Sequence, residues 1–295
     1  SSGGSCCGGG GSARRGADSG GEREMFKEAF IADSRTAERV FKVQSSNLLR
    51  AEYESRVARL ERDIYTRMKE DPQVPTEYLA HGPLMDFTTS LMDALAESVQ
   101  ESARDSVHAL ERLLVRTLGS AAQLDEHAFS AGLRERATVQ SELAQRDMAA
   151  KIMGHVFVKV AQSPSIGTAK ERSVQVSNIL DEAWWRIQRV ARTETAFAYN
   201  AVRIDALRSI SSRFPNLMQR WTERLDDPDA QGVSADSVEM HGQVVKIGAH
   251  FHMPDSAGRW AHPPNRSNDS AVVTPWQPGW GVPAWSWAGQ KIWHP

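Results

Sequence analysis

The feature that most constrains the fold is a stretch from Met25 to Met68 that contains neither proline nor glycine. Its later apolar residues recur at steps of three and four, which places them on one face of a helix. These residues are Val57, Leu60, Ile64 and Met68. An unbroken helix of this length would extend roughly 65 Å. The polar run Ser45-Ser46-Asn47 is the expected break.

A loop and a second helix are expected next. Pro72, Pro75 and the pair Gly82-Pro83 mark the loop, because proline and glycine interrupt regular structure. Apolar residues at helical spacing then predict a helix from Leu84 to Thr117. Gly119 is suited to end it, because glycine accepts the left-handed conformation that often closes a helix.

Two more helices complete the helical part of the chain. One is expected over Asp125–Gln162, after which Ser163-Pro164-Ser165 and Gly167 break the chain. The other is expected from Thr168 to Arg213, ending before Pro215, since the residue before a proline disfavours the helical conformation.

The composition changes after Trp221. Seven of the nine tryptophans lie from there onward, and eight of the thirteen prolines lie from Pro228 onward. Gly242–Ile247 alternates well enough to predict a strand. The segment Trp276–Pro295 has no periodicity, and two alternatives stay open for it. It either lies extended against other surfaces with its indoles as anchors, or it folds locally around them.

Bulk properties exclude several classes of protein. The formal net charge of −2 over 295 residues provides no global basic field for nucleic acid. We expect no membrane span and no secretory signal, because no run of about 18 apolar residues is present and the N-terminal region lacks an apolar core. Cys6 and Cys7 lie in the Gly/Ser-rich residues 1–22, which we expect to be a flexible tail with two free thiols.

One helix carries a carboxylate on an otherwise apolar stripe. The stripe comprises Ala183, Ile187, Val190, Glu194, Phe197, Ala201 and Ile204. The helical neighbours of Glu194 on this stripe include no cation, and a buried unpaired carboxylate is costly. We therefore expect Glu194 to be buried and paired with a donor from elsewhere in the fold. Arg192 points to a different face.

The segment Arg189–Arg203, with Arg192, Thr193 and Glu194 at its centre, resembles the signature of the Mu F-like head-morphogenesis proteins of bacteriophages. In that family an Ala-Arg-Thr-Glu-Thr core lies on a helix ahead of a small β module. The resemblance covers roughly residues 170–276.

The order of the downstream elements is similar as well. Trp221 with Asp226 and Asp227 resembles the family's Trp-then-Asp strand. Gly242-Gln243 and the two valines that follow resemble its Gly-Gln-Val-Val element. The stretch Pro263–Trp276 resembles its closing loop and final strand.

The chain departs from the family pattern at possible metal ligands. Many members carry Cys or His after the first Asp, and Asn-Cys-Arg near the end. Here Ser237 and Asn268-Asp269-Ser270 stand at those places, so we expect no cysteine metal cluster and no cofactor.

The more specific functions that single motifs suggest have less support in the sequence. The turn that starts at Asp227 resembles a calcium loop, but Val238 stands where a bidentate Glu is required. His241, His250, His252 and His262 could serve a metal-dependent hydrolase or toxin-like enzyme, yet no metal-binding helix motif accompanies them. Glu194 with Asp226 and Asp227 has no nucleophile fixed beside it, so a structural role is expected.

A basic strip is the remaining candidate for binding phosphate. Arg50, Arg56, Arg59 and Arg62 recur along one helix. Because arginines and carboxylates alternate along all the helices, a solvated surface is the favoured interpretation.

The predicted fold class is mainly α, with long N-terminal helices, a small α+β module and an extended Trp/Pro-rich tail. Its parts are a tail (1–22), a helical region (23–167), the Mu F-like module (168–276) and a C-terminal tail (277–295). The indoles proposed as interaction anchors are Trp276, Trp280, Trp285 and Trp287.

The resemblance implies a non-enzymatic minor protein of the phage head. It would bind the portal protein or the major capsid protein, be assembled in the host cytoplasm and remain in the virion head. Contact with packaged DNA is left open. A cellular helical adaptor is the other non-enzymatic alternative.

Overall fold

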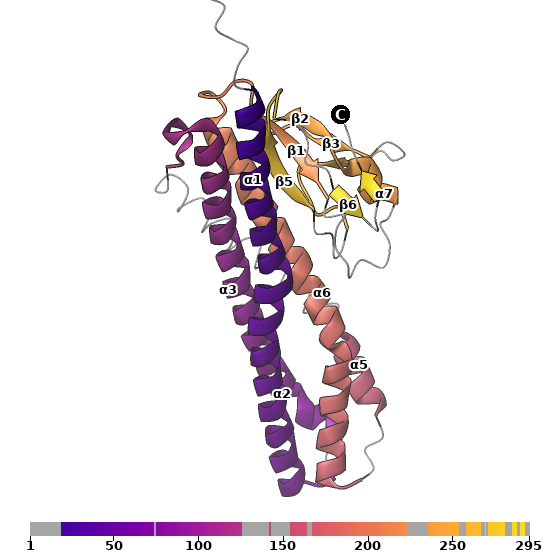
Figure 1. Cartoon of the computed structure of the whole chain (residues 1–295). Coiled ribbons are helices and arrows are strands. Elements are labelled where there is room, and N and C mark those ends of the chain that lie inside the picture. The colour runs from indigo at the N-terminus through magenta and orange to yellow at the C-terminus, as the bar shows by residue number, and fades with distance from the viewer. Residues whose placement is uncertain are drawn as a thin grey trace, which may run out of the picture.

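The computed structural model describes residues 19–73, 75–125, 142, 154–163, 167–223, 235–253, 258–266, 269, 271–280, 285–287 and 290–292. Within these residues a bundle of long helices carries a small antiparallel β module beside one end (Figure 1). The predicted mainly helical fold is therefore confirmed, together with its small strands. The predicted tail and most of the helix expected at 125–162 lie outside the described residues, although residues 19–22 already belong to the first helix.

The N-terminal helices form one rod. Helix α1 (Ser19–Glu38) passes through a π-helical segment (Arg39–Gln44) directly into α2 (Ser45–Glu70). The predicted break at 45–47 is wrong, because the chain stays helical there. A π-helical turn holds more residues per turn than an α-helix, so it can shift the buried face without ending the helix.

Helix α3 (Thr76–Leu118) begins earlier than expected. Its first turns include Gly82 and Pro83, so the predicted loop at that pair is wrong and the connection shrinks to 71–75. Pro83 removes one backbone donor, but the buried Leu84 and Phe87 anchor the segment to the core. Gly119 ends the helix as predicted, with φ 81° and its N–H donating to the Val115 carbonyl at 2.9 Å.

Helices α5 (Gly154–Gln162) and α6 (Ala169–Ile210) follow. The start of α6 near Thr168 is confirmed by a capping box. The Glu171 N–H donates to the Thr168 hydroxyl at 3.3 Å, while the Thr168 N–H donates to the Glu171 carboxylate at 2.7 Å. The helix ends at Ile210, before Pro215 as expected.

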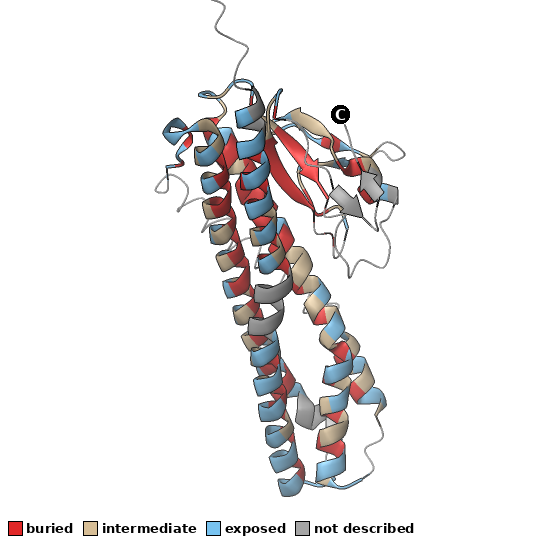
Figure 2. Ribbon diagram, in the orientation of Figure 1, coloured by how far each residue is buried: buried red, intermediate tan, exposed pale blue. Residues whose placement is uncertain are grey.

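Helix α6 contributes to two successive cores. Its first half packs with α2, α3 and α5, and its second half packs with α1, α3 and the β module. Figure 2 shows the buried faces of the helices turned toward one another. On α3, Ser102 and Ser106 donate to the carbonyls of Thr195 and Tyr199 on α6, at 3.1 and 2.6 Å. None of the described helices is long and apolar enough to cross a membrane.

The main sheet of the β module has three antiparallel strands in the order β2-β1-β5. These are β1 (Met218–Thr222), β2 (Val244–Lys246) and β5 (Val272–Trp276), so the strands expected at 242–247 and at the end of the module are present. Helix α7 (Ala235–Met240) precedes β2. Two small hairpins pair β3 (Phe251–His252) with β4 (Arg259–Trp260) and β6 (Trp285–Trp287) with β7 (Gln290–Ile292).

Candidate functional site at the junction of helix and β module

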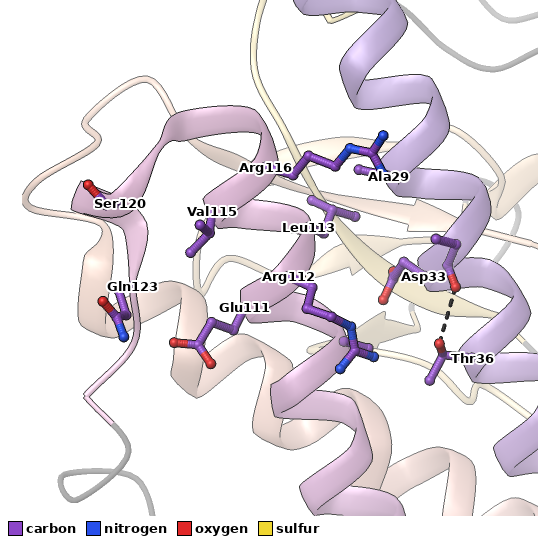
Figure 3. A pocket seen from close by; sticks show the side chains of 12 residues that line it. Ala29, Asp33, Thr36, Glu111, Arg112, Leu113, Val115, Arg116, Ser120 and Gln123 are labelled. Atoms are coloured by element: carbon purple, nitrogen blue, oxygen red, sulfur yellow. Dashed lines mark hydrogen bonds between the residues drawn. The ribbon is translucent and has the colours of Figure 1, made fainter.

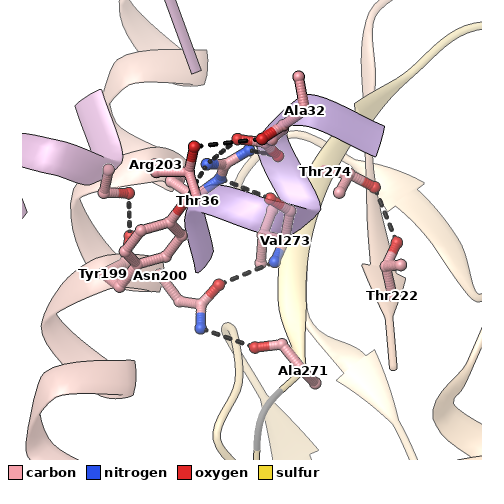
Figure 4. Close-up of polar contacts among 11 residues, drawn as sticks. Ala32, Thr36, Tyr199, Asn200, Arg203, Thr222, Ala271, Val273 and Thr274 are labelled. Atoms are coloured by element: carbon pink, nitrogen blue, oxygen red, sulfur yellow. Dashed lines mark hydrogen bonds and ion pairs between the residues drawn. The ribbon is translucent and has the colours of Figure 1, made fainter. Parts of the chain in front are cut away.

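Helix α6 closes the open edge of strand β5 with a side chain. The Asn200 amide accepts from the Val273 N–H at 2.8 Å and donates to the Ala271 carbonyl at 3.0 Å (Figure 4). Its amide nitrogen also donates to the Ala196 carbonyl at 2.9 Å. Unpaired edge strands invite unwanted pairing and must be covered. Asn200 therefore takes the place of a neighbouring strand and fixes the sheet to the helix.

One turn further along α6, Arg203 joins three elements. Its guanidinium donates to the Asp33 carboxylate of α1 at 2.9 and 2.6 Å. It also donates to the Val273 carbonyl of β5 at 2.7 Å and to the Tyr199 hydroxyl at 3.2 Å. Arg203 and Asp33 are both buried. The pair thus holds the N-terminal rod, α6 and the sheet at one point.

The electrostatics of this junction keep its charges in place. Burial acts against the charged form of Arg203, but the Asp33 carboxylate offsets it and raises the pKa of Arg203 above its ordinary value. Burial, followed by the Asp33 charge, also raises the pKa of the Tyr199 hydroxyl. The junction therefore consists of an ion pair and a neutral phenol at neutral pH.

A second buried cluster lies inside the β module. Glu223 follows β1, and Asp269 precedes β5; their carboxyl groups share a hydrogen bond. Both Asp269 oxygens accept backbone N–H groups, from Ala271 at 2.9 Å and Asn265 at 3.0 Å. The Trp221 indole donates to Glu223 at 2.9 Å.

Two neighbouring carboxyls in a buried site resist ionisation. Burial, followed by the Asp269 charge, raises the pKa of Glu223 from 4.5 to about 8. Burial also raises the pKa of Asp269. Because Asp269 already accepts two backbone N–H groups, we assign the retained proton to Glu223.

Ser237 of α7, His241 just after that helix and Arg266 ahead of β5 supply the other polar side chains of this cluster. The Glu223 N–H donates to Nδ1 of His241 at 3.1 Å, so the proton of a neutral imidazole sits on Nε2. The Arg266 guanidinium donates to the Ser237 hydroxyl. The two positions where the chain departs from the family pattern, Ser237 and Asp269, therefore belong to one cluster.

The motif residues of the β module have structural roles. Trp221 is fully buried and meets Phe251 edge to face, with ring centroids 5.3 Å apart. Gly242 has φ 85° in the turn before β2, a conformation that favours glycine. The Gln243 amide donates to the His252 carbonyl at 2.7 Å and accepts from its N–H at 3.2 Å, which ties β2 to β3.

The predicted burial of Glu194 is wrong. Arg192, Thr193 and Glu194 are all half-buried. The buried face passes through Ala191 and Thr195 instead, next to them in sequence. The predicted stripe averaged about 3.5 residues per turn, whereas a helix has about 3.6, so the true face drifts away from it. Phe197, also on the predicted stripe, is exposed and packs against His262.

The proposed tryptophan anchors fall into different settings. Trp280 is buried within the chain and stacks on Phe26 of α1, with centroids 4.6 Å apart. Trp280 is thus wrong as an anchor for a partner, because internal packing already uses its indole. Trp276 is half-buried at the end of β5. Trp285 and Trp287 lie on β6, and the environment of their side chains is outside the described residues.

The metal alternatives receive no support from the described histidines. His241 is buried in the carboxyl cluster, His250 and His252 are exposed, and His262 packs on Phe197. Among the described residues, no group of three or more His, Cys, Asp or Glu side chains is placed to hold a metal ion. Asp226, Asp227 and the calcium-like loop lie outside those residues.

Three of the four arginines in the basic strip of α2 are paired along the helix. Arg50 bonds Glu54 at 2.7 Å, Arg56 bonds Glu52, and Arg59 lies 3.9 Å from Asp63. These pairs favour a solvated charged surface over a strip that awaits phosphate.

A cleft of about 640 Å³ opens between α1 and α3 (Figure 3). Ala29 and Ala109 belong to its apolar lining, and Asp33 belongs to its polar lining. Its charged residues are largely engaged: Asp33 bonds Arg203, and Arg116 bonds Glu28 at 2.6 Å. The cleft offers surface for binding but pairs no nucleophile with a base.

Sequence reasoning singled out Glu194 and missed Asn200 and Arg203, which lie in the same signature segment. The sequence does indicate these two residues, because both are polar within the otherwise apolar run at 196–204. Glu223 and Asp269 were also within the quoted motifs, but nothing in the sequence indicated that they meet. No family model, curated protein or solved structure matches the chain.

Proposed function

We propose that this chain is a minor structural protein of a bacteriophage head that acts in capsid assembly. The observation that supports it most is the convergence of the sequence pieces that carry the Mu F-like resemblance. The signature helix α6, Trp221 on β1, the Gly242-Gln243 turn and strand β5 belong to one folded unit. A module that uses these pieces in this order requires them to pack together.

In this proposal the chain works by binding and positioning, with no catalytic turnover of its own. The long helices present an extended surface, on which Trp185 and Val158 are the most exposed large apolar residues described. Partly exposed aromatic side chains are common anchors of protein interfaces. The β module is the compact docking unit, and the Arg203–Asp33 junction keeps the two parts in a fixed relation.

The proposed partners are the portal protein and the major capsid protein, at the inner surface of the head in the virion. Packaged DNA is a weaker candidate, because the net charge is −2 and the arginines of α2 are mostly paired with carboxylates. A contact with DNA would require a local patch elsewhere.

A pull-down from assembling heads tests this proposal. The full chain with an affinity tag should enrich the portal or the major capsid protein. The Trp185→Ala chain should enrich less of the same partner, and Glu97→Ala, an exposed change on α3, should behave as the unaltered chain does. Recovery of no head protein with the unaltered chain would count against the proposal.

A further inference from the structure

Arg220, in the middle of β1, is a buried cation without a partner in the described part of the chain. Its side chain is 1% exposed, and its Nε and Nη2 atoms have no hydrogen-bond partner there. Burial lowers its pKa from 12.5 to about 10, and no carboxylate opposes that shift. The guanidinium therefore stays charged at neutral pH, although a buried charge is costly when nothing compensates it.

Arg203, another buried arginine of the described chain, has an acceptor for each of its three guanidinium nitrogens. Arg203 has a carboxylate, a carbonyl and a hydroxyl as partners. Arg220 has a guanidinium of the same shape and a similar burial, but no acceptor for two of its nitrogens. This contrast points to an acceptor that comes from outside the described residues.

The strand register shows what surrounds Arg220 on its face of the sheet. Thr274 of β5 and Val244 of β2 lie directly opposite Arg220. Lys246 is the next residue of β2 on the same face. Opposite residues of antiparallel strands project to the same face. The remaining residues of this face are Met218, Thr222, Val272 and Trp276. The strand residues of this face thus include two cations and two threonines, whose hydroxyls hydrogen-bond each other at 2.8 Å, and none of them is a carboxylate.

The two ends of this face differ in access. At one end Val272 packs with Phe41 and Tyr199 of the helices. At the other end Lys246 is exposed. Arg220 and Thr274, which are 1% and 2% exposed, lie between the end covered by the helices and the end marked by Lys246.

We propose that Arg220 binds one oxyanion, a carboxylate or phosphate group of a ligand, on this face of the sheet. The planar guanidinium can donate two parallel hydrogen bonds to such a group. Lys246 can supply an ammonium donor from the exposed end of this face, and Thr274 can donate its hydroxyl while it accepts from Thr222. This inference goes beyond the role in head assembly. It can be tested on the isolated chain, so its outcome does not depend on that role.

Thermal unfolding of the full chain in different anions tests the site. Sodium phosphate and sodium acetate are the two probes, and sodium chloride at equal ionic strength is the reference. A ligand that binds only the folded chain raises Tm as its concentration passes Kd. We expect phosphate or acetate to raise the Tm of the unaltered chain above the chloride reference. The stronger of the two identifies the preferred class of oxyanion.

Arg220→Met is the decisive variant, and Arg259→Met on the exposed surface of β4 is its matched control. Arg220→Met should raise the apparent Kd for the anion by at least about tenfold. It should be no less stable than the unaltered chain in chloride, since it replaces an unpaired charge with an apolar side chain. Arg259→Met should keep the full response.

Two results would overturn the assignment: no rise in Tm beyond chloride in the unaltered chain, or an equal rise in Arg220→Met. If Arg220→Met fails to fold, Arg220→Lys takes its place, because lysine keeps the charge but loses the two-pronged geometry. A lysine chain with an undiminished response to both anions would likewise refute the site.

Discussion

Arg203 of α6 and Asp33 of α1 form a two-point ion pair inside the fold, with Nη1 2.9 Å from Oδ1 and Nη2 2.6 Å from Oδ2. The two residues are 170 positions apart in the chain. Because Arg203 also holds the Val273 carbonyl, the pair joins the N-terminal rod, the signature helix and the sheet. We regard this junction as the structural centre of the chain.

The first prediction concerns this pair. Asp33→Ala leaves Arg203 buried and uncompensated, and should lower the free energy of unfolding by about 3–5 kcal/mol. Combining Asp33→Leu with Arg203→Met should cost much less, because no charge is left alone. Urea denaturation measures both. Arg208→Ala, which breaks the exposed pair with Asp205, is the control and should cost less than about 1 kcal/mol. Equal losses for Asp33→Ala and Arg208→Ala would refute the role of the pair.

The second prediction concerns the edge of β5. Asn200→Leu removes the partners of the Val273 N–H and the Ala271 carbonyl, and should cost about 1–3 kcal/mol for each group left buried and unsatisfied. The amide of Val273 should lose protection in hydrogen exchange. Ser209→Ala, near the end of the same helix, should leave that amide unchanged. Full protection of Val273 in Asn200→Leu would mean that the edge is held by other contacts.

The third prediction concerns pH. The folded chain holds Glu223 protonated with a pKa of about 8, whereas the unfolded chain ionises it near its ordinary 4.5. Unfolding therefore releases a proton between about pH 4.5 and 8, so the stability contributed by this group falls as pH rises, by at most about 1.4 kcal/mol per pH unit. Above about pH 8 the folded chain ionises too, and this slope ends.

Glu223→Gln should reduce this slope and make the chain more stable than the unaltered one at pH 8, because Glu223 no longer has to be kept neutral. Glu239→Gln on α7 is the matched control and should keep the slope. The measurement is the free energy of unfolding from pH 5.5 to 9. A Glu223→Gln chain that follows the same pH profile as the unaltered chain would disprove the buried acid.

The fourth prediction separates two tryptophans. Trp280 stacks on Phe26 inside the core, so Trp280→Ala should cost about 3–5 kcal/mol of stability. Trp276→Ala, at a half-buried position on β5, should cost less. Thermal or urea unfolding of the two variants compares them directly. A larger loss for Trp276→Ala would show that the tail packs differently.

The sequence predicted the long helices because their apolar spacing and caps are local. The helix start near Thr168 and the stop at Gly119 were both predicted, because each depends on residues within about one turn; the structure adds the capping box at Thr168. The loop predicted at Pro83 was wrong because the conformation there is not decided locally. The local preference of Pro83 favours a loop, but the burial of Leu84 and Phe87 outweighs it, and that packing depends on distant segments.

The candidate sites were only partly predictable. The elements of the β module followed from strand pattern and resemblance, yet the sequence could not show that Glu223 meets Asp269, or that Arg203 meets Asp33. Such pairs depend on tertiary packing between segments far apart in the chain. The signature helix was located correctly, but its buried face was assigned by an averaged period that chose Glu194 over Asn200 and Arg203.

The most direct test of the central claim is the infectivity of particles assembled without this chain. The proposal predicts that heads formed in its absence are fewer, misassembled or non-infectious, and that supplying the unaltered chain restores them. The Asp33→Ala chain should restore them less well, since its junction is weakened. Normal assembly and infection without the chain would contradict the head-morphogenesis function.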